Sequence, residues 1–167
     1  MRIRSATPSD RTAIAAVHTA SWQTAYRGTL PDEYLDNKAG DEIRRSWSGI
    51  EFSSEDVVLV AEDEQVVGFI AVWCKPDPFI DNLHVFPEQM SKGIGRKLMR
   101  AAAQELERLG HSTAYLWVFA SNERAIRFYE RLGGVRAVLE NKDVLGHIIP
   151  SFKIEWRDVS VIQNRGD

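Results

Sequence analysis

The chain has 167 residues, of which 44% are hydrophobic and 27% charged, a composition typical of a globular protein and unlike that of a disordered one. This length fits one domain, residues 1–167, with a full hydrophobic core. The formal net charge of −3 argues against nucleic acid or an anionic membrane as the main partner, because those surfaces need a basic face. The single cysteine, Cys74, excludes an intrachain disulfide and a multi-cysteine zinc site, and favours a cytoplasmic location.

No stretch of the sequence indicates targeting or membrane insertion. Residues 1–5 lack the apolar run of a secretory signal, so we expect no such signal. The longest apolar stretches, 57–61 and 66–73, have the length of strands and fall short of the roughly 20 apolar residues that span a bilayer.

The first third of the chain is predicted to be mainly helical. A short strand at 2–6 is followed by a helix over about 10–25, which ends before Gly28. One face of that helix carries apolar and aromatic residues at steps of three and four: Ile14, Val17, His18, Trp22 and Tyr26. Two further short helices are predicted near 31–35 and 41–50.

The middle of the chain changes to the pattern of strands. Stretches 57–62 and 66–74 are rich in β-branched residues and flank a polar turn, which predicts a hairpin. A third strand is predicted over 79–85. Strict alternation along it would place four side chains on one face, namely Phe79, Asp81, Leu83 and Val85, and three on the other, namely Ile80, Asn82 and His84.

The remainder alternates between helices and strands. The predicted elements are a helix over 93–109, a strand over 113–119, a helix over 122–132, and strands over 135–139 and 147–157. The fold class is therefore α/β, a mixed sheet with helices on both faces.

A glycine-containing loop opens the helix at 93–109. It reads Lys92-Gly93-Ile94-Gly95-Arg96, and glycines let the backbone approach a ligand closely. The first amides of a helix lack internal partners and carry a partial positive charge, so the loop suits a phosphate. An ordinary tight turn is the alternative. The spacing fits neither the nucleoside-triphosphate loop nor the dinucleotide fingerprint.

The helix at 122–132 supplies a second candidate element. Asn122 is expected to cap its first turn, and Tyr129 lies two turns further on. Tyr129 is either a core residue with a satisfied hydroxyl or a proton donor to a leaving thiolate.

Together these two elements resemble the GNAT superfamily of N-acetyltransferases. The stretch from Met90 to Gly95 matches the pattern [QR]-x-x-G-x-[GA] of that family, except that Met90 replaces Gln or Arg. Asn122, Ala125, Tyr129 and Gly133 match its later pattern N-x-x-A-x-x-x-Y-x-x-x-G. The matching motifs fall within residues 79–135. A second departure is Gly134, which stands where an aromatic residue usually follows.

The resemblance implies a splayed sheet of about six to seven strands and acetyl-CoA as cosubstrate, with no metal. The residues that it implies for acetyl-CoA binding are Leu83, His84, Val85, Met90, Ser91, Lys92, Gly93, Ile94, Gly95, Arg96, Asn122 and Tyr129. Tyr129 would protonate the CoA thiolate after direct attack of an amine on the thioester. Cys74 is then a core thiol rather than a nucleophile.

The attacking amine must be neutral, so a general base or a water chain is needed. Asp81 is the first candidate and His84 the second, with a structural role as the alternative for each. Trp22 and Tyr26 are the candidates for contact with the acceptor, which is expected to be a small molecule or a peptide amine. Packing between helix and sheet is their alternative role. The expected partner is this acceptor. A homodimer is a further possibility, and the sequence leaves the oligomeric state open. The alternative function is a non-catalytic CoA-binding module with a regulatory or interaction role.

Overall fold

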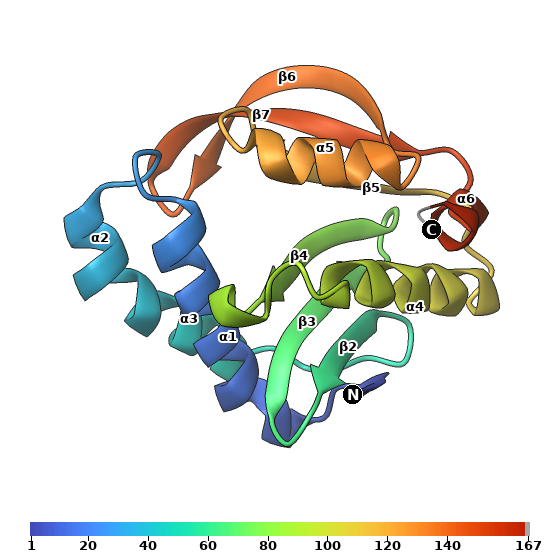
Figure 1. The fold of residues 1–167 in the computed structure, drawn as a ribbon, viewed down its shortest axis with the longest axis horizontal. Coiled ribbons are helices and arrows are strands. Elements are labelled where there is room, and N and C mark those ends of the chain that lie inside the picture. Colours follow the sequence, from blue (N-terminus) through green and yellow to red (C-terminus); the bar gives the residue numbers. More distant parts are fainter. Residues whose placement is uncertain (166–167) are drawn as a thin grey trace.

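The structure, a computed structural model, describes residues 1–165 as a seven-stranded mixed sheet with helices on both faces (Figure 1). The strands are β1 (Arg2–Ser5), β2 (Val57–Glu62), β3 (Val66–Trp73), β4 (Phe79–Val85), β5 (Ala114–Phe119), β6 (Val135–Val144) and β7 (His147–Trp156). The α-helices are α1 (Arg11–Ala25), α2 (Asp32–Asn37), α3 (Ala39–Ser48), α4 (Ile94–Arg108), α5 (Glu123–Arg131) and α6 (Ser160–Asn164). Two single-turn 3-10 helices, η1 (Pro8–Asp10) and η2 (Pro87–Gln89), precede α1 and α4.

The sheet is divided into two arms at its centre. Its strand order is β1-β2-β3-β4-β5-β7-β6, and every neighbouring pair is antiparallel except β4 and β5. These two parallel strands are in register at a single pair, Phe79 and Tyr115, after which they separate. Figure 1 shows the result, with α4 on the arm of β4 and α5 on the arm of β5. The splayed mixed sheet predicted from the sequence is thus confirmed.

Each face of the sheet buries its own hydrophobic cluster. Residues of α4, α5 and α6 pack on one face, where Leu98, Met99 and Leu106 are almost fully buried. Residues of α1, α2 and α3 pack on the other, around Trp47 and Phe69. This second cluster is called the α1 side below.

Strand β4 contains a β-bulge at Asp81. Asn82 pairs with Ala71 and Ile80 with Val72, so Asp81 has no opposite residue in β3. The extra residue reverses the alternation, and both Ile80 and Leu83 pack in the cluster under α4. The prediction that Asp81 shares a face with Leu83 is therefore wrong.

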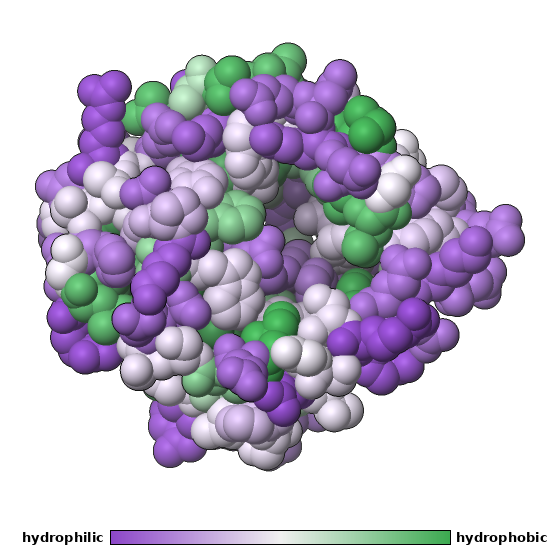
Figure 2. Space-filling view, turned by 180° about the vertical axis from the view of Figure 1, so that it is seen from behind, coloured by the Kyte–Doolittle hydropathy of each residue, from purple (hydrophilic) through white to green (hydrophobic). Residues whose placement is uncertain are grey.

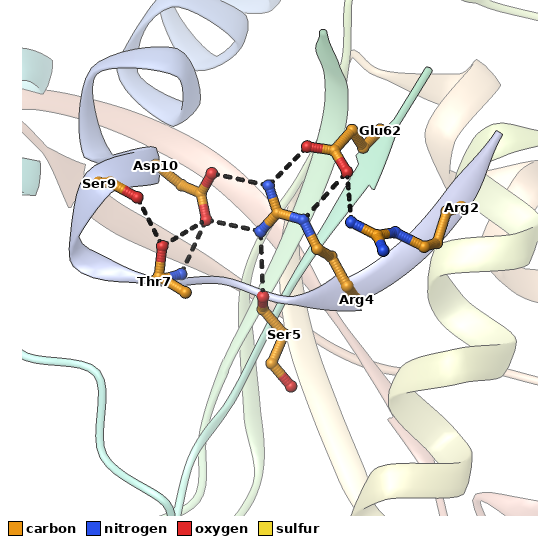
Figure 3. A network of polar contacts seen from close by, with 7 residues as sticks. All are labelled: Arg2, Arg4, Ser5, Thr7, Ser9, Asp10 and Glu62. Carbon is orange, nitrogen blue, oxygen red and sulfur yellow. Dashed lines mark hydrogen bonds and ion pairs between the residues drawn. The ribbon is translucent and has the colours of Figure 1, made fainter. Parts of the chain in front are cut away.

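A network of charged side chains joins β1 to the start of α1 (Figure 3). The guanidinium of Arg4 donates to both carboxylate oxygens of Asp10, at 2.8 and 3.0 Å, and at 2.8 Å to Glu62 on β2. The carboxylate of Asp10 also accepts from the Thr7 backbone amide at 2.8 Å and from its hydroxyl. The hydrogen bonds from Arg4 lower the pKa of Asp10 to about 2. This network fixes the chain where it leaves the sheet edge and enters the helix.

The predicted elements agree with the structure in order and type, with two differences near the C-terminus. Strand β6 extends to Val144, and α6 was not predicted although its Ile162 is buried against α4.

The structure also explains why glycine, rather than an aromatic residue, stands at position 134. A Cβ at Gly134 would lie 2.8 Å from the Trp156 indole and 2.5 Å from Ile154, so these side chains fill the space of the expected aromatic residue.

Candidate active site

A cleft of about 720 Å³ lies where the two arms of the sheet separate. In the space-filling view of Figure 2, seen from behind Figure 1, the molecule is hollowed at its centre. One wall comes from α1, β4 and the start of α4, and the other from β5 and α5. Nearly all residues predicted for the site line it: Tyr26, Asp81, Leu83, His84, Val85, Met90, Ser91, Gly93, Ile94, Gly95, Arg96, Asn122 and Tyr129.

At one end of the cleft, the loop before α4 leaves backbone amides that have no hydrogen-bond partner within residues 1–165. Ser91 and Gly93 both have positive φ, at 66° and 77°, and Gly93 directly precedes the helix. The first helical hydrogen bond runs from the Lys97 amide to the Gly93 carbonyl at 3.1 Å. The amides of residues 94–96 therefore precede the helical hydrogen-bond ladder and are available to an anion. Because a Cβ at Gly93 would meet nothing within 4 Å, this site is open.

Three arginines line the same cleft, and only Arg96 was predicted from the sequence. Arg124 and Arg131 come from α5 on the opposite wall. Arg124 donates to the Ser91 hydroxyl at 3.0 Å and so joins the two walls. Their signal in the sequence was two basic positions of the later family pattern: Arg124 stands between Asn122 and Ala125, and Arg131 follows Tyr129 by two residues.

Of the other predicted residues, Lys92 and Met90 lie in the loop before α4, and Asn122 lies at the start of α5. The Lys92 ammonium donates to Gln89 at 2.9 Å, and Lys92 does not line the cleft. Met90 lines the cleft, and the residue is 38% exposed. The Asn122 side chain accepts from the Ala125 amide at 3.3 Å, so the predicted helix cap is confirmed.

Tyr129 lies in the wall formed by α5, where it is buried. Its ring contacts Phe128 and meets Trp156 edge-on. Burial raises the pKa of the phenol above its ordinary value, and the nearby Tyr26 raises it further. The hydroxyl is therefore protonated at neutral pH and can donate a proton.

Asp81 and His84 lie on the other wall, on the α1 side of β4. One carboxylate oxygen of Asp81, Oδ2, accepts from the Trp73 indole at 2.9 Å and from Asn82 at 3.1 Å. Asp81 is exposed in the cleft. His84 is hydrogen-bonded through Nδ1 to the Ser21 hydroxyl at 2.9 Å. Burial lowers the pKa of His84 to about 3, so its imidazole is neutral at physiological pH.

The two aromatic candidates for acceptor contact have different positions. Tyr26 lines the cleft at the end of α1, and its ring lies 4.5 Å from that of Phe119 on β5. Burial raises the pKa of Tyr26 to about 12. Trp22 packs in the core of the α1 side, 8% exposed and edge-on to His18, and does not line the cleft. Trp117, whose ring carries the Lys142 ammonium at 3.6 Å, lines the cleft instead.

Within residues 1–165, no group of three or more His, Cys, Asp or Glu side chains is placed to hold a metal ion. Within the same residues, no helix combines the length and the apolar character needed to cross a membrane.

Comparison with known proteins gives one family. The sequence model of the Acetyltransferase (GNAT) family matches residues 16–134. The uncharacterised N-acetyltransferase YuaI of Bacillus subtilis is 27% identical over 96% of this chain and 95% of its own length. The ribosomal protein bS18-alanine N-acetyltransferase of Escherichia coli is 44% identical over 52 residues, which are 31% of this chain and 35% of that protein.

The fold is also found among solved structures. The PaiA N-acetyltransferase of Thermoplasma acidophilum, solved in complex with coenzyme A, superposes with a TM-score of 0.70 at 24% identity. The superposition covers 92% of this chain and 96% of that one.

Proposed function

The chain belongs to the GNAT family of acetyltransferases, and from this premise we propose that it transfers the acetyl group of acetyl-CoA directly to an amine. The amine belongs to a small molecule or a peptide. The observation that carries the proposal is the cleft between β4 and β5, which has an anion site at one end and Tyr129 in its wall.

The cleft fits the chemical parts of acetyl-CoA. The open amides of residues 94–96, with Arg96 and Arg124 nearby, suit the pyrophosphate. The edge of β4 at Leu83 and Val85 faces the gap between the arms, where its free backbone groups suit the amides of the pantetheine arm. A complex of the PaiA relative with coenzyme A supports the same ligand here.

The proposed reaction is a direct transfer. The amine nitrogen attacks the thioester carbonyl carbon, the carbon–sulfur bond breaks, and sulfur leaves as a thiolate. Tyr129 then donates its phenolic proton to that sulfur; burial raises the pKa of the phenol, so the proton is present at neutral pH before the thiolate forms. The proton lost by the amine passes to a base or to water.

Two groups on the α1 side of β4 are candidates to accept that proton. Asp81 is exposed in the cleft and carries the negative charge that would accept it. His84 lies on the same side but is a weak base, since burial holds its pKa at about 3. We therefore assign proton acceptance to Asp81, directly or through water.

Both classes of acceptor remain in the proposal. The local similarity to an enzyme named for a ribosomal-protein alanine supports a peptide amine. The aromatic cleft wall of Tyr26 and Phe119 would also accommodate a small cationic amine by cation–π attraction.

A thiol-release assay tests the function. Acetyl-CoA is incubated with the protein and a panel of amines that includes polyamines, amino acids and alanine-starting peptides, and free CoA is measured. We expect acceptor-dependent release with at least one amine, and an acetylated product of the matching mass. Tight binding of acetyl-CoA without transfer to any amine would instead favour the non-catalytic CoA-binding module.

A further inference from the structure

His84 is held on three sides by residues far from it in sequence. Its ring stacks on that of His18 from α1, with centroids 4.5 Å apart and planes 20° apart. Phe69 from β3 lies 5.6 Å away at a tilt of 42°. Ser21, one turn after His18 on α1, holds Nδ1 at 2.9 Å. The imidazole therefore has a fixed plane and a fixed edge.

His18 is itself anchored from behind. Its Nδ1 accepts a hydrogen bond from the indole of the buried Trp47 on α3, at 3.0 Å. That bond places the proton of neutral His18 on Nε2, and burial lowers the pKa of His18 well below its ordinary value. His18 thus supplies a neutral flat surface on which His84 rests.

The second ring nitrogen of His84 is open to the cleft. Nε2 makes no hydrogen bond among the described residues, and unlike Nε2 of His18 it is not a buried atom. Within residues 1–165, no hydrogen bond or ion pair joins a carboxylate to this ring. The groups that face it are His18 and Ser21 from α1 and Phe69 from β3, and the nearest acid on its own strand is Asp81. A neutral imidazole in this setting can orient a hydrogen-bonding group without taking its proton.

We propose that Ser21 is a positioning residue for the transfer: its oxygen accepts the Nδ1 proton of His84, so that the Nε2 lone pair receives an N–H of the acceptor amine and orients it toward the thioester. This inference rests on the function proposed above. The opposite tautomer would present an N–H to the amine, and that N–H would compete for the lone pair that must attack.

The tautomer can be read without any activity. In the ¹⁵N spectrum of the histidine rings, wild-type His84 should carry its proton on Nδ1 and remain neutral down to about pH 5. In Ser21→Ala, the proton should move to Nε2, which is the usual position in water. A wild-type His84 with its proton on Nε2 would overturn the proposal, even in a fully active enzyme.

Kinetics provide the second readout. Ser21→Ala should lower kcat/KM for the acceptor by roughly 3- to 10-fold, the effect of one lost neutral hydrogen bond. The KM for acetyl-CoA should not change. Ser21→Thr, which keeps the hydroxyl, should restore most of the loss. The control Thr19→Val removes a hydroxyl from the same helix that is bound to the Ala15 carbonyl, and it should behave as wild type.

The pH profile separates orientation from proton transfer. His84→Gln should lower kcat/KM but leave its acidic limb at the wild-type pH, whereas Asp81→Asn should shift or remove that limb. A limb that moves in His84→Gln would make His84 the base and overturn the inference. A wild type that binds acetyl-CoA but acetylates no amine would instead count against the proposed function, with the tautomer still decided by the spectrum.

Discussion

Two polar clusters of this protein are built from similar groups but completed in different ways. In the network of Figure 3, Arg4 reaches both Asp10 and Glu62, and Asp10 also accepts from Thr7. In the cleft, by contrast, the first amides of α4 and the Nε2 of His84 face open space. A polar group whose hydrogen bonds are satisfied within the chain stabilises the fold, whereas a polar group left unsatisfied in a concave site is available to a ligand.

The largest effect expected in the cleft is that of Tyr129→Phe. The substitution removes one hydroxyl and keeps the ring packed against Phe128 and Trp156, so folding should change little. If the phenol protonates the thiolate, the chemical step should slow by about 10²- to 10⁴-fold, the usual contribution of a general acid. Acetyl-CoA affinity should stay within a few-fold.

Single-turnover kinetics is the right measurement, because product release can limit steady-state turnover. Since burial raises the pKa of Tyr129, deprotonation of this phenol should not limit the rate near neutral pH. A chemical step at the wild-type rate would reduce Tyr129 to a packing residue and leave the anion site unaffected.

The second test places a charge in the anion site. Gly95→Asp adds a carboxylate beside the open amides of α4, where a Cβ makes only ordinary contact with Phe128 at 3.5 Å. The repulsion should weaken acetyl-CoA binding by about 100-fold or more, as measured by calorimetry. Gly49→Asp, the same change at an exposed position outside the cleft, should bind normally. Equal affinity in a folded Gly95→Asp protein would show that the phosphates lie elsewhere.

The third test removes an ion pair from the network of Figure 3. Asp10→Asn removes a charge that is 9% exposed and holds Arg4, so the free energy of unfolding should fall by about 2 kcal/mol. Urea unfolding measures this fall. Asp36→Asn, in the exposed pair with Arg27, should change the midpoint little.

The same variant has a pH signature. The pKa of Asp10 is about 2 in the folded protein, below its value near 3.9 in an unfolded chain. Its stabilisation is therefore complete above about pH 4 and is lost as the pH falls toward 2. The stability of Asp10→Asn should vary less in that interval, and equal slopes for both proteins would contradict the assignment.

The sequence indicated which residues line the cleft better than it indicated how the residues around them are arranged. The glycine loop and Tyr129 were candidates on local grounds and gained their roles from the resemblance to the GNAT patterns, and the amides at a helix start lack internal partners whatever the rest of the fold. Trp22 and Tyr26 lie on one helical face, but only the structure shows that Trp22 turns into the core while Tyr26, at the helix end, reaches the cleft.

Features that depend on distant pairing could not be read from local patterns. The bulge at Asp81 arises from the register with β3, so alternation within β4 alone gave the wrong face. The bond between Ser21 and His84 joins residues 63 positions apart. Helix α6 depends on packing against α4, because its five residues are too short to be stable alone.

The smallest expected effect adds a donor to the open cluster. Met90 lines the cleft with its backbone extended and the residue 38% exposed, at the position where the family pattern has Gln or Arg. Met90→Arg should keep or modestly tighten acetyl-CoA binding. The gain should be at most the roughly 1.5–3 kcal/mol of a hydrogen bond to a charged group. Met90→Leu keeps the apolar character and should bind as wild type.

Calorimetry at low and high salt shows whether any gain comes from a new contact between the introduced guanidinium and phosphate, since such a contact should weaken as salt increases. A large loss of affinity in Met90→Arg would mean that the side chain at this position points into the nucleotide rather than along it. The register of the loop against the phosphates would then have to shift by one residue, toward Gln89.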